Sequence, residues 1–75
     1  MTTKIIVEKE ARKIALRLMQ ERVDKNWSQD ELAKRAGLDR KTVNRIENLR
    51  YSPSMETFLR LCEALKLKAH EITKN

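Results

Sequence analysis

Apolar residues recur along this chain at the three- and four-residue spacing of amphipathic helices, and strand-like alternation is confined to a few positions. The first such stretch predicts a helix from about Glu8 to Lys25. Asn26 can end this helix, because asparagine tolerates the left-handed backbone that often follows a helix. The residues that recur on one face are Ala11, Ile14, Ala15, Leu18 and Arg22. The pattern therefore favours an all-α fold.

A short second helix follows. Ser28 and Glu31 have the spacing of a capping box, so the helix is predicted to start at Ser28. Trp27 precedes the cap and is expected to pack on Leu32 as a hydrophobic staple. Gly37 supplies the left-handed residue that ends the helix.

A third helix is joined to the second by a three-residue turn that contains the glycine. Asp39 is expected to cap it, Leu38 to pack on Val43, and the helix to end near Asn48. Its spacing places Val43 and Ile46 inward. The outward residues are Arg40, Lys41, Asn44 and Arg45.

A loop over residues 49–52 leads to a fourth helix, which Pro53 and Ser54 open and which is predicted to reach about Lys66. Its buried stripe is expected to comprise Met55, Phe58, Leu61, Cys62 and Leu65. A last short turn would then cover the base of the core with Leu67, Ala69 and Ile72.

The 75 residues leave room for one domain, and residues 1–7 lie outside the main pattern as an N-terminal extension. Ile5, Ile6 and Val7 fit three alternatives, which stay open: a disordered tail, an extra helical turn, or a short strand that pairs across a dimer.

The charge adds a preference for anionic partners. Seventeen basic against eleven acidic residues give a net charge of +6, which suits a protein that meets polyphosphate or an anionic surface. Much of this charge also fits a merely solvated helix surface, so the placement of the cations has to decide. No apolar stretch approaches the ~20 residues that cross a bilayer, and the single cysteine, with no apolar leader, favours a cytoplasmic or nucleoid location without a membrane.

Catalytic chemistry is not indicated. Cys62 lies on a predicted buried stripe and is interpreted as an inert thiol, while His70 has no partner at ligand spacing. We therefore expect no enzyme activity, no metal site, no cofactor and no small-molecule ligand. Trp27 and Phe58 are isolated along the chain, so they are interpreted as core residues and not as platforms for stacked bases.

The run WSQDELAKRAGLDRKTVNRIEN, followed by SPSMETFLRLCEALKL, resembles the lambda-repressor-like helix-turn-helix family. This family includes phage repressors, Cro-type proteins and restriction-modification controller proteins. The resemblance covers roughly residues 14–72. It implies a five-helix DNA-binding fold in which the third helix lies in the major groove and the second crosses the DNA backbone.

The resemblance and the outward face of the third helix together nominate DNA contacts. Arginine suits a bidentate contact with guanine, and the other polar residues of this helix suit a thymine methyl, an adenine edge or a phosphate. The predicted base-readout residues are Arg40, Lys41, Thr42, Asn44 and Arg45. The predicted contacts to the DNA backbone are Ser28, Gln29, Asn48, Arg50, Tyr51 and Ser52.

The resemblance also implies a partly buried ion pair between Arg22 and Glu47, which spacing alone would leave on the surface. The chain departs from the family at Asn26, Leu49 and Lys66, where glycines are common. Leu49 and Lys66 would strain a left-handed residue after the helix, so their helix ends are expected to shift. Lys68 replaces the usual serine cap of the final helix.

The leading hypothesis is a repressor or activator that binds a palindromic operator in double-stranded DNA as a homodimer. The alternative is an antitoxin-like protein-interaction module that binds DNA secondarily, and a third class is a nonspecific nucleoid protein. The apolar atoms expected to pair the two copies come from Met55, Leu59, Leu67, Ala69 and Ile72.

Overall fold

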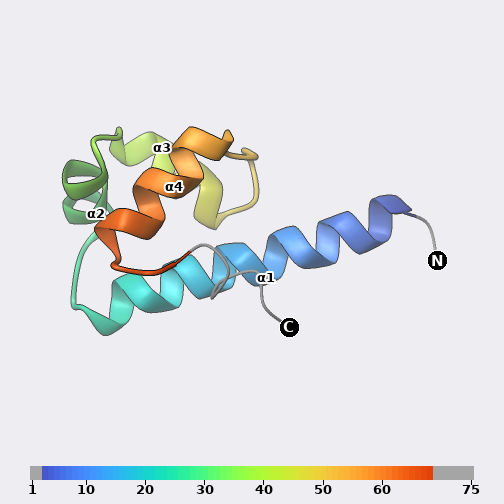
Figure 1. Ribbon diagram of the computed structural model, residues 1–75, viewed down its shortest axis with the longest axis horizontal. Coiled ribbons are helices and arrows are strands. Elements are labelled where there is room, and N and C mark those ends of the chain that lie inside the picture. The colour runs from blue at the N-terminus through green and yellow to red at the C-terminus, as the bar shows by residue number, and fades with distance from the viewer. Residues whose placement is uncertain (1–2, 69–75) are drawn as a thin grey trace.

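The computed structural model describes residues 3–68, with the backbone alone for residues 4–7. Four helices make up its regular structure: α1 (Thr3–Asp24), α2 (Gln29–Ala36), α3 (Arg40–Glu47) and α4 (Met55–Ala64) (Figure 1). No helix in this range has the length and apolarity needed to cross a membrane.

The five-helix count expected from the resemblance is not confirmed, since the described part of the chain holds four helices. The last short turn was expected to include Ala69 and Ile72, which lie outside the described residues.

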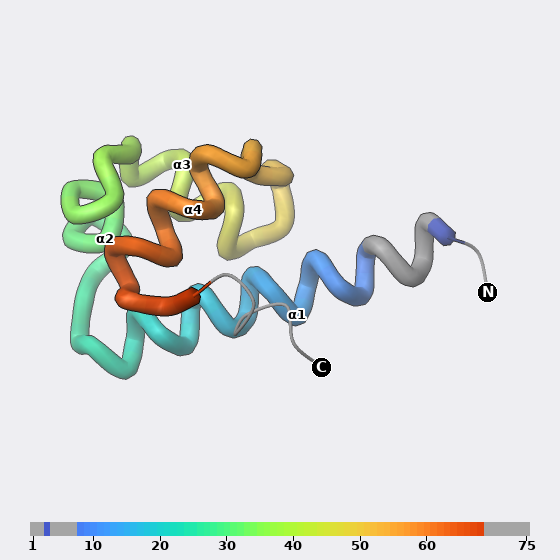
Figure 2. The backbone as a smooth tube through the Cα atoms, viewed as in Figure 1, coloured from blue at the N-terminus to red at the C-terminus, as the bar shows by residue number. Residues whose placement is uncertain are grey.

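Helix α1 lies against the other three helices through its C-terminal half, and its N-terminal half extends beyond them (Figure 2). The helix begins at Thr3, so of the three alternatives for the N-terminal extension the structure has additional helical turns. Neither glycine nor proline occurs between residues 3 and 24, and the helix therefore meets no intrinsic stop before Asp24.

The cap of α2 is formed as predicted, with the Ser28 hydroxyl oxygen accepting a hydrogen bond from the Glu31 backbone N–H at 3.0 Å. The reciprocal half of the capping box is absent, because the Glu31 carboxylate accepts from Arg35 at 2.8 Å. Asp39 occupies the capping position of α3 in extended backbone, but its side chain makes no capping hydrogen bond. The spacing thus predicted the positions of both caps correctly, but of the side-chain capping hydrogen bonds that it predicted, the one from Ser28 is formed.

All four helices end in the same hydrogen-bonded turn. Each is followed by a residue with positive φ, and the next N–H bonds back to a carbonyl five residues earlier, as when Leu38 donates to Ala33 at 2.8 Å. The left-handed residues are Asn26, Gly37, Leu49 and Lys66. Asn26 (φ 60°) ends α1 as predicted, whereas the expected shift at Leu49 and Lys66 is wrong, since the turn hydrogen bonds hold both at φ near 60° (59° and 58°).

The core lies where α2, α3 and α4 meet the C-terminal half of α1. Its buried residues are Ala15, Leu18, Leu32, Ala33, Ala36, Val43, Ile46, Leu61, Cys62 and Leu65. Trp27 and Phe58 are half-buried against this core, in agreement with their interpretation as core residues. Burial raises the pKa of the Cys62 thiol, which favours the unreactive protonated form.

Two residues expected in the core are not there. Met55 is 71% exposed, because it opens α4 at the edge of the helix cluster. Ala11, in the N-terminal half of α1, is exposed as well.

Candidate nucleic-acid interface

Helix α3 presents a polar outer face because its apolar residues fix its rotation. Val43 and Ile46 are almost fully buried, so the residues between them face solvent. Four of the five predicted base-readout residues are exposed and together line a shallow hollow: Arg40, Lys41, Asn44 and Arg45. The fifth, Thr42, is half-buried.

The cations on this face have no acidic partner. Within residues 8–68, Arg40, Lys41 and Arg45 form no ion pair, whereas Lys34 and Arg35 of α2 pair with Asp30 and Glu31. Unpaired cations retain their full attraction for an external anion. The outer face of α3 is therefore equipped to meet phosphates and base acceptors.

The sole acid of α3 is turned into the protein. Glu47 accepts hydrogen bonds from Arg22 Nε at 2.8 Å and from Arg22 Nη2 at 3.0 Å, and its side chain is only 4% exposed. Arg22 Nη1 also donates to the Trp27 carbonyl at 2.7 Å. The ion pair implied by the resemblance is thus confirmed, and it joins α1 to the end of α3.

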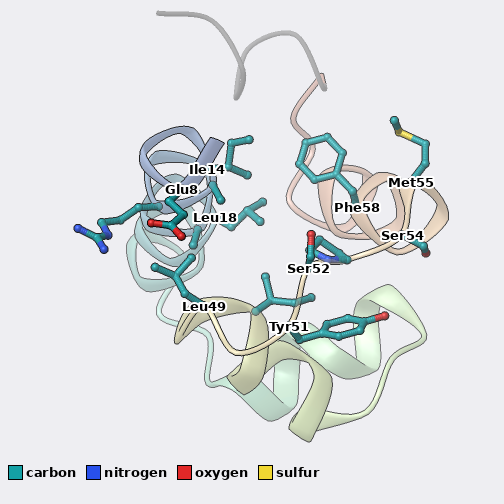
Figure 3. Close-up of a pocket in the computed structure, with 14 residues that line it drawn as sticks. Glu8, Ile14, Leu18, Leu49, Tyr51, Ser52, Ser54, Met55 and Phe58 are labelled. Carbon is teal, nitrogen blue, oxygen red and sulfur yellow. The ribbon is translucent and has the colours of Figure 1, made fainter. Parts of the chain in front are cut away.

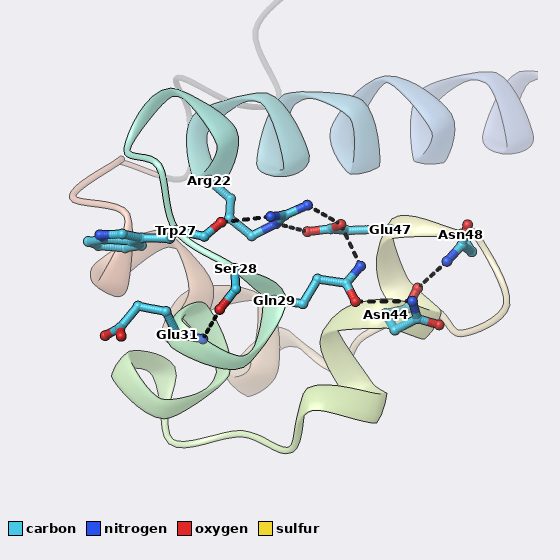
Figure 4. A network of polar contacts seen from close by, with 8 residues as sticks. All are labelled: Arg22, Trp27, Ser28, Gln29, Glu31, Asn44, Glu47 and Asn48. Carbon is cyan, nitrogen blue, oxygen red and sulfur yellow. Dashed lines mark hydrogen bonds and ion pairs between the residues drawn. The ribbon is translucent and has the colours of Figure 1, made fainter.

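The ion pair continues into a chain of side-chain amides that sequence reasoning did not predict (Figure 4). Gln29 Nε2 donates to Glu47 Oε1 at 3.0 Å, and Asn44 Nδ2 donates to Gln29 Oε1 at 3.1 Å. Gln29 is half-buried, and its side-chain amide bonds to two residues of α3. It was predicted only as a contact to the DNA backbone. Its place at the start of α2 was readable from sequence, but its direction toward α3 was not.

The predicted contacts to the DNA backbone lie at both ends of the helix-turn-helix. Ser28 is exposed at the N-terminus of α2, beside N–H groups that have no partner within the helix. Arg50, Tyr51 and Ser52 are exposed in the loop after α3. Asn48 is also exposed, and its side-chain amide donates to the Asn44 carbonyl at 2.9 Å.

A comparison with known families decides what this arrangement is. A family model described as helix-turn-helix matches residues 18–72, which include all the elements just described except the first part of α1. The chain belongs to the lambda-repressor-like helix-turn-helix family. The family assignment agrees with the helix-turn-helix that α2 and α3 form.

A curated protein and a solved structure are similar to this helix-turn-helix chain. "Neisseria hypothetical transcription factor" of Neisseria meningitidis serogroup B is 37% identical over 51 residues, which make up 68% of this chain and 48% of that protein. The chain thus spans about half the length of this curated relative. The crystal structure of hypothetical transcription factor NHTF from Neisseria matches with a TM-score of 0.79 and 33% sequence identity, covering 88% of this chain and 75% of that chain.

The residues predicted to pair two copies of this helix-turn-helix protein have different surroundings. Met55 and Leu59 are 71% and 47% exposed on α4, whereas Leu67 is half-buried against the core. Ala69 and Ile72 lie outside the described residues. Of the three predicted positions that the structure describes, Met55 and Leu59 are the exposed ones.

A groove of about 580 Å³, which sequence did not predict, lies between α1 and α4. Figure 3 shows Ile14 and Leu18 on one wall, Phe58 and Met55 on the other, and Leu49 and Tyr51 from the loop after α3. Its lining is mostly apolar, and it includes Glu8, Ala11 and Arg12 from the N-terminal half of α1.

Proposed function

We propose that this protein is a transcriptional regulator that binds a palindromic operator as a homodimer, with α3 in the major groove. The observation that carries the proposal is the outer face of α3, where Arg40, Lys41 and Arg45 are exposed and free of ion pairs. An α-helix fits the major groove, and arginine makes the commonest specific contact there, with guanine O6 and N7.

The remaining DNA contacts follow from the same orientation. With α3 in the groove, the N-terminus of α2 faces one phosphate backbone, where Ser28 and the helix dipole favour an anion. The loop with Arg50, Tyr51 and Ser52 adjoins the other end of α3 and supplies a second set of backbone contacts. These contacts position the protein, and the side chains of α3 read the bases.

A dimer follows from the amount of sequence that one helix reads. A single recognition helix contacts only a few base pairs, whereas two copies related by a two-fold axis read two half-sites about 34 Å apart. Met55 and Leu59 supply exposed apolar surface for this contact, and both lie on α4, away from the outer face of α3.

Selection of binding sites from random duplex DNA tests the proposal, and we expect a palindromic sequence to be enriched. Arg45→Ala should then weaken cognate binding by roughly 1–3 kcal/mol and relax the preference at one position per half-site. Arg50→Ala, at a backbone position, should weaken cognate and random DNA alike and flatten the dependence of affinity on salt. Equal losses on cognate and random DNA for Arg45→Ala would refute the readout role.

Sedimentation of the protein without DNA tests the dimer. Wild type should sediment as a dimer at tens of micromolar, and Leu59→Glu should give a folded monomer, because that side chain is exposed. A folded wild-type monomer at this concentration would contradict a dimer that forms without DNA. Leu67→Glu is the contrasting variant, since a half-buried residue packed on the core should unfold the protein when it is charged.

An antitoxin-like interaction module that binds DNA secondarily is the second candidate, and the apolar groove between α1 and α4 is the feature that favours it. The same selection experiment separates the two functions. A regulator should enrich one site without any protein partner, whereas an interaction module should show little sequence preference on its own.

A further inference from the structure

We propose that Gln29 holds the side-chain amide of Asn44 with its oxygen facing the DNA, so that Asn44 selects a base bearing an exocyclic amine. Adenine and cytosine carry such an amine in the major groove, whereas guanine and thymine present a carbonyl oxygen there. Gln29 is thereby a positioning residue and Asn44 a specificity-determining residue. The inference rests on the proposed function and adds a direction of hydrogen bonding to it.

The direction is fixed from the buried end of the network. The Glu47 carboxylate is an acceptor only, and it receives Arg22 Nε and Nη2 as well as Gln29 Nε2. A reversed Gln29 amide would place its carbonyl oxygen against that carboxylate, with two acceptors about 3 Å apart and no proton between them. Gln29 must therefore turn its nitrogen to Glu47 and its oxygen to α3.

The same matching of donors and acceptors fixes the orientation of the Asn44 amide. Gln29 Oε1 can only accept, so the neighbouring amide of Asn44 must present Nδ2, as it does at 3.1 Å. The two ends of a primary amide lie on opposite sides of one carbon, so Asn44 Oδ1 points away from Gln29 (Figure 4). Because Asn44 is exposed on the outer face of α3, its oxygen is offered to whatever that face meets.

The locked amide differs in kind from its neighbours. Arg40, Lys41 and Arg45 can only donate hydrogen bonds, and they suit guanine, thymine or phosphate oxygens. An unconstrained asparagine could rotate its amide by half a turn and donate to the same oxygens. Because Gln29 fixes its amide, Asn44 instead presents its side-chain oxygen, which accepts a hydrogen bond from a base amine and is repelled by a base carbonyl oxygen.

The inference is tested by measuring the affinity for operator variants. The operator position read by Asn44 is first identified as the one at which Asn44→Ala loses its base preference. Each of the four bases is then placed at that position. Wild type should bind adenine or cytosine there at least about fivefold more tightly than guanine or thymine. Gln29→Met keeps the length of the side chain and removes the lock, so this ratio should fall below about twofold. The matched control is Ser28→Ala, which removes a neighbouring polar group and should lower affinity for all four operators while leaving the ratio unchanged.

A second variant tests the outward acceptor without changing Gln29. Asn44→Asp has acceptors only, so it loses the hydrogen bond to Gln29 and should weaken all binding through its charge, yet it should retain the preference for adenine or cytosine. In the DNA-free protein, the side-chain N–H groups of Asn44 should exchange with solvent several-fold faster in Gln29→Met than in wild type.

The outcomes distinguish this inference from the proposed function. If wild type shows no sequence-specific binding, the proposed function fails and this inference fails with it. If specific binding is found but the ratio survives in Gln29→Met, or wild type prefers guanine or thymine at this position, the positioning role alone is wrong.

Discussion

Helices α2 and α3 have eight residues each and pack on the same core, yet they handle their charges in opposite ways. In α2, Lys34 and Arg35 are each paired four residues back with an acid on the helix surface. In α3, the only acid is buried against Arg22 of another helix, and the cations are left without partners. The two helices differ because the acids of α2 lie on its surface, whereas the acid of α3 points into the protein.

This comparison explains how a small basic protein concentrates its field. Opposite charges side by side on α2 largely cancel beyond about 10 Å at moderate salt. On α3 the acid is neutralised inside the protein, so the positive charge of the outer face is undiminished. A buried ion pair therefore contributes to the charge pattern of the surface as well as to the packing of the helices.

The largest expected effect comes from breaking the buried pair. Arg22→Met leaves Glu47 charged, 4% exposed and without its bidentate donor, which should cost about 3–5 kcal/mol of unfolding free energy. Lys34→Met is the matched change on α2, where an exposed pair is removed and the cost should stay below about 0.5 kcal/mol. Urea unfolding followed by circular dichroism measures both.

The double variant Arg22→Met with Glu47→Leu sharpens this test. Because no lone charge is left buried, much of the lost stability should return. Equal stabilities for Arg22→Met and Lys34→Met would show that burial makes no difference to these pairs.

The left-handed residues that follow α2 and α4 should give the next largest changes in stability. Gly37→Ala places a side chain at φ 69°, with its Cβ 3.0 Å from Arg60 Nη1, and should cost about 1–2 kcal/mol. Lys66→Gly makes the opposite change at another left-handed residue and should stabilise the protein by about 1 kcal/mol. Shifts in the urea midpoint at constant slope check both, and two shifts of the same sign would contradict the strain argument.

Removing the N-cap side chains of α2 and α3 should produce a smaller difference in stability. Ser28→Ala removes a hydroxyl that accepts from Glu31 N–H, and about 1 kcal/mol of stability should go with it. Asp39→Ala removes no capping bond, so only the favourable charge at the helix N-terminus is lost, a few tenths of a kcal/mol. Thermal unfolding of the two variants side by side would detect a reversed order, which would contradict the cap assignments.

The smallest effect is expected on the salt dependence of DNA affinity. Arg50→Ala removes an unpaired cation from the loop after α3, where a phosphate contact is proposed, and should reduce the slope of log affinity against log salt by about 0.9. Lys34→Ala removes a paired cation from α2 and should leave the slope unchanged. Titrations over a salt series compare the two, and equal changes in slope would mean that pairing does not decide which cations serve DNA.

Local sequence determined much of this fold. The caps at Ser28 and Ser54, the glycine turn and the inward positions of Val43 and Ile46 are properties of a few neighbouring residues, and they were predictable for that reason. The polar outer face of α3 follows from the same periodicity. The resemblance to the family added the pairing of Arg22 with Glu47, which spacing alone would have left on the surface.

Tertiary structure alone decided the rest. Leu49 and Lys66 adopt a left-handed backbone although their own preference is against it, and the periodicity of the helices does not report this. The direction of Gln29 depends on a carboxylate 18 residues away, and that carboxylate is an acceptor held in place by an arginine from α1. Periodicity reports which side of a helix is buried, whereas a hydrogen bond between helices depends on the distance and orientation of groups that only the packed chain brings together.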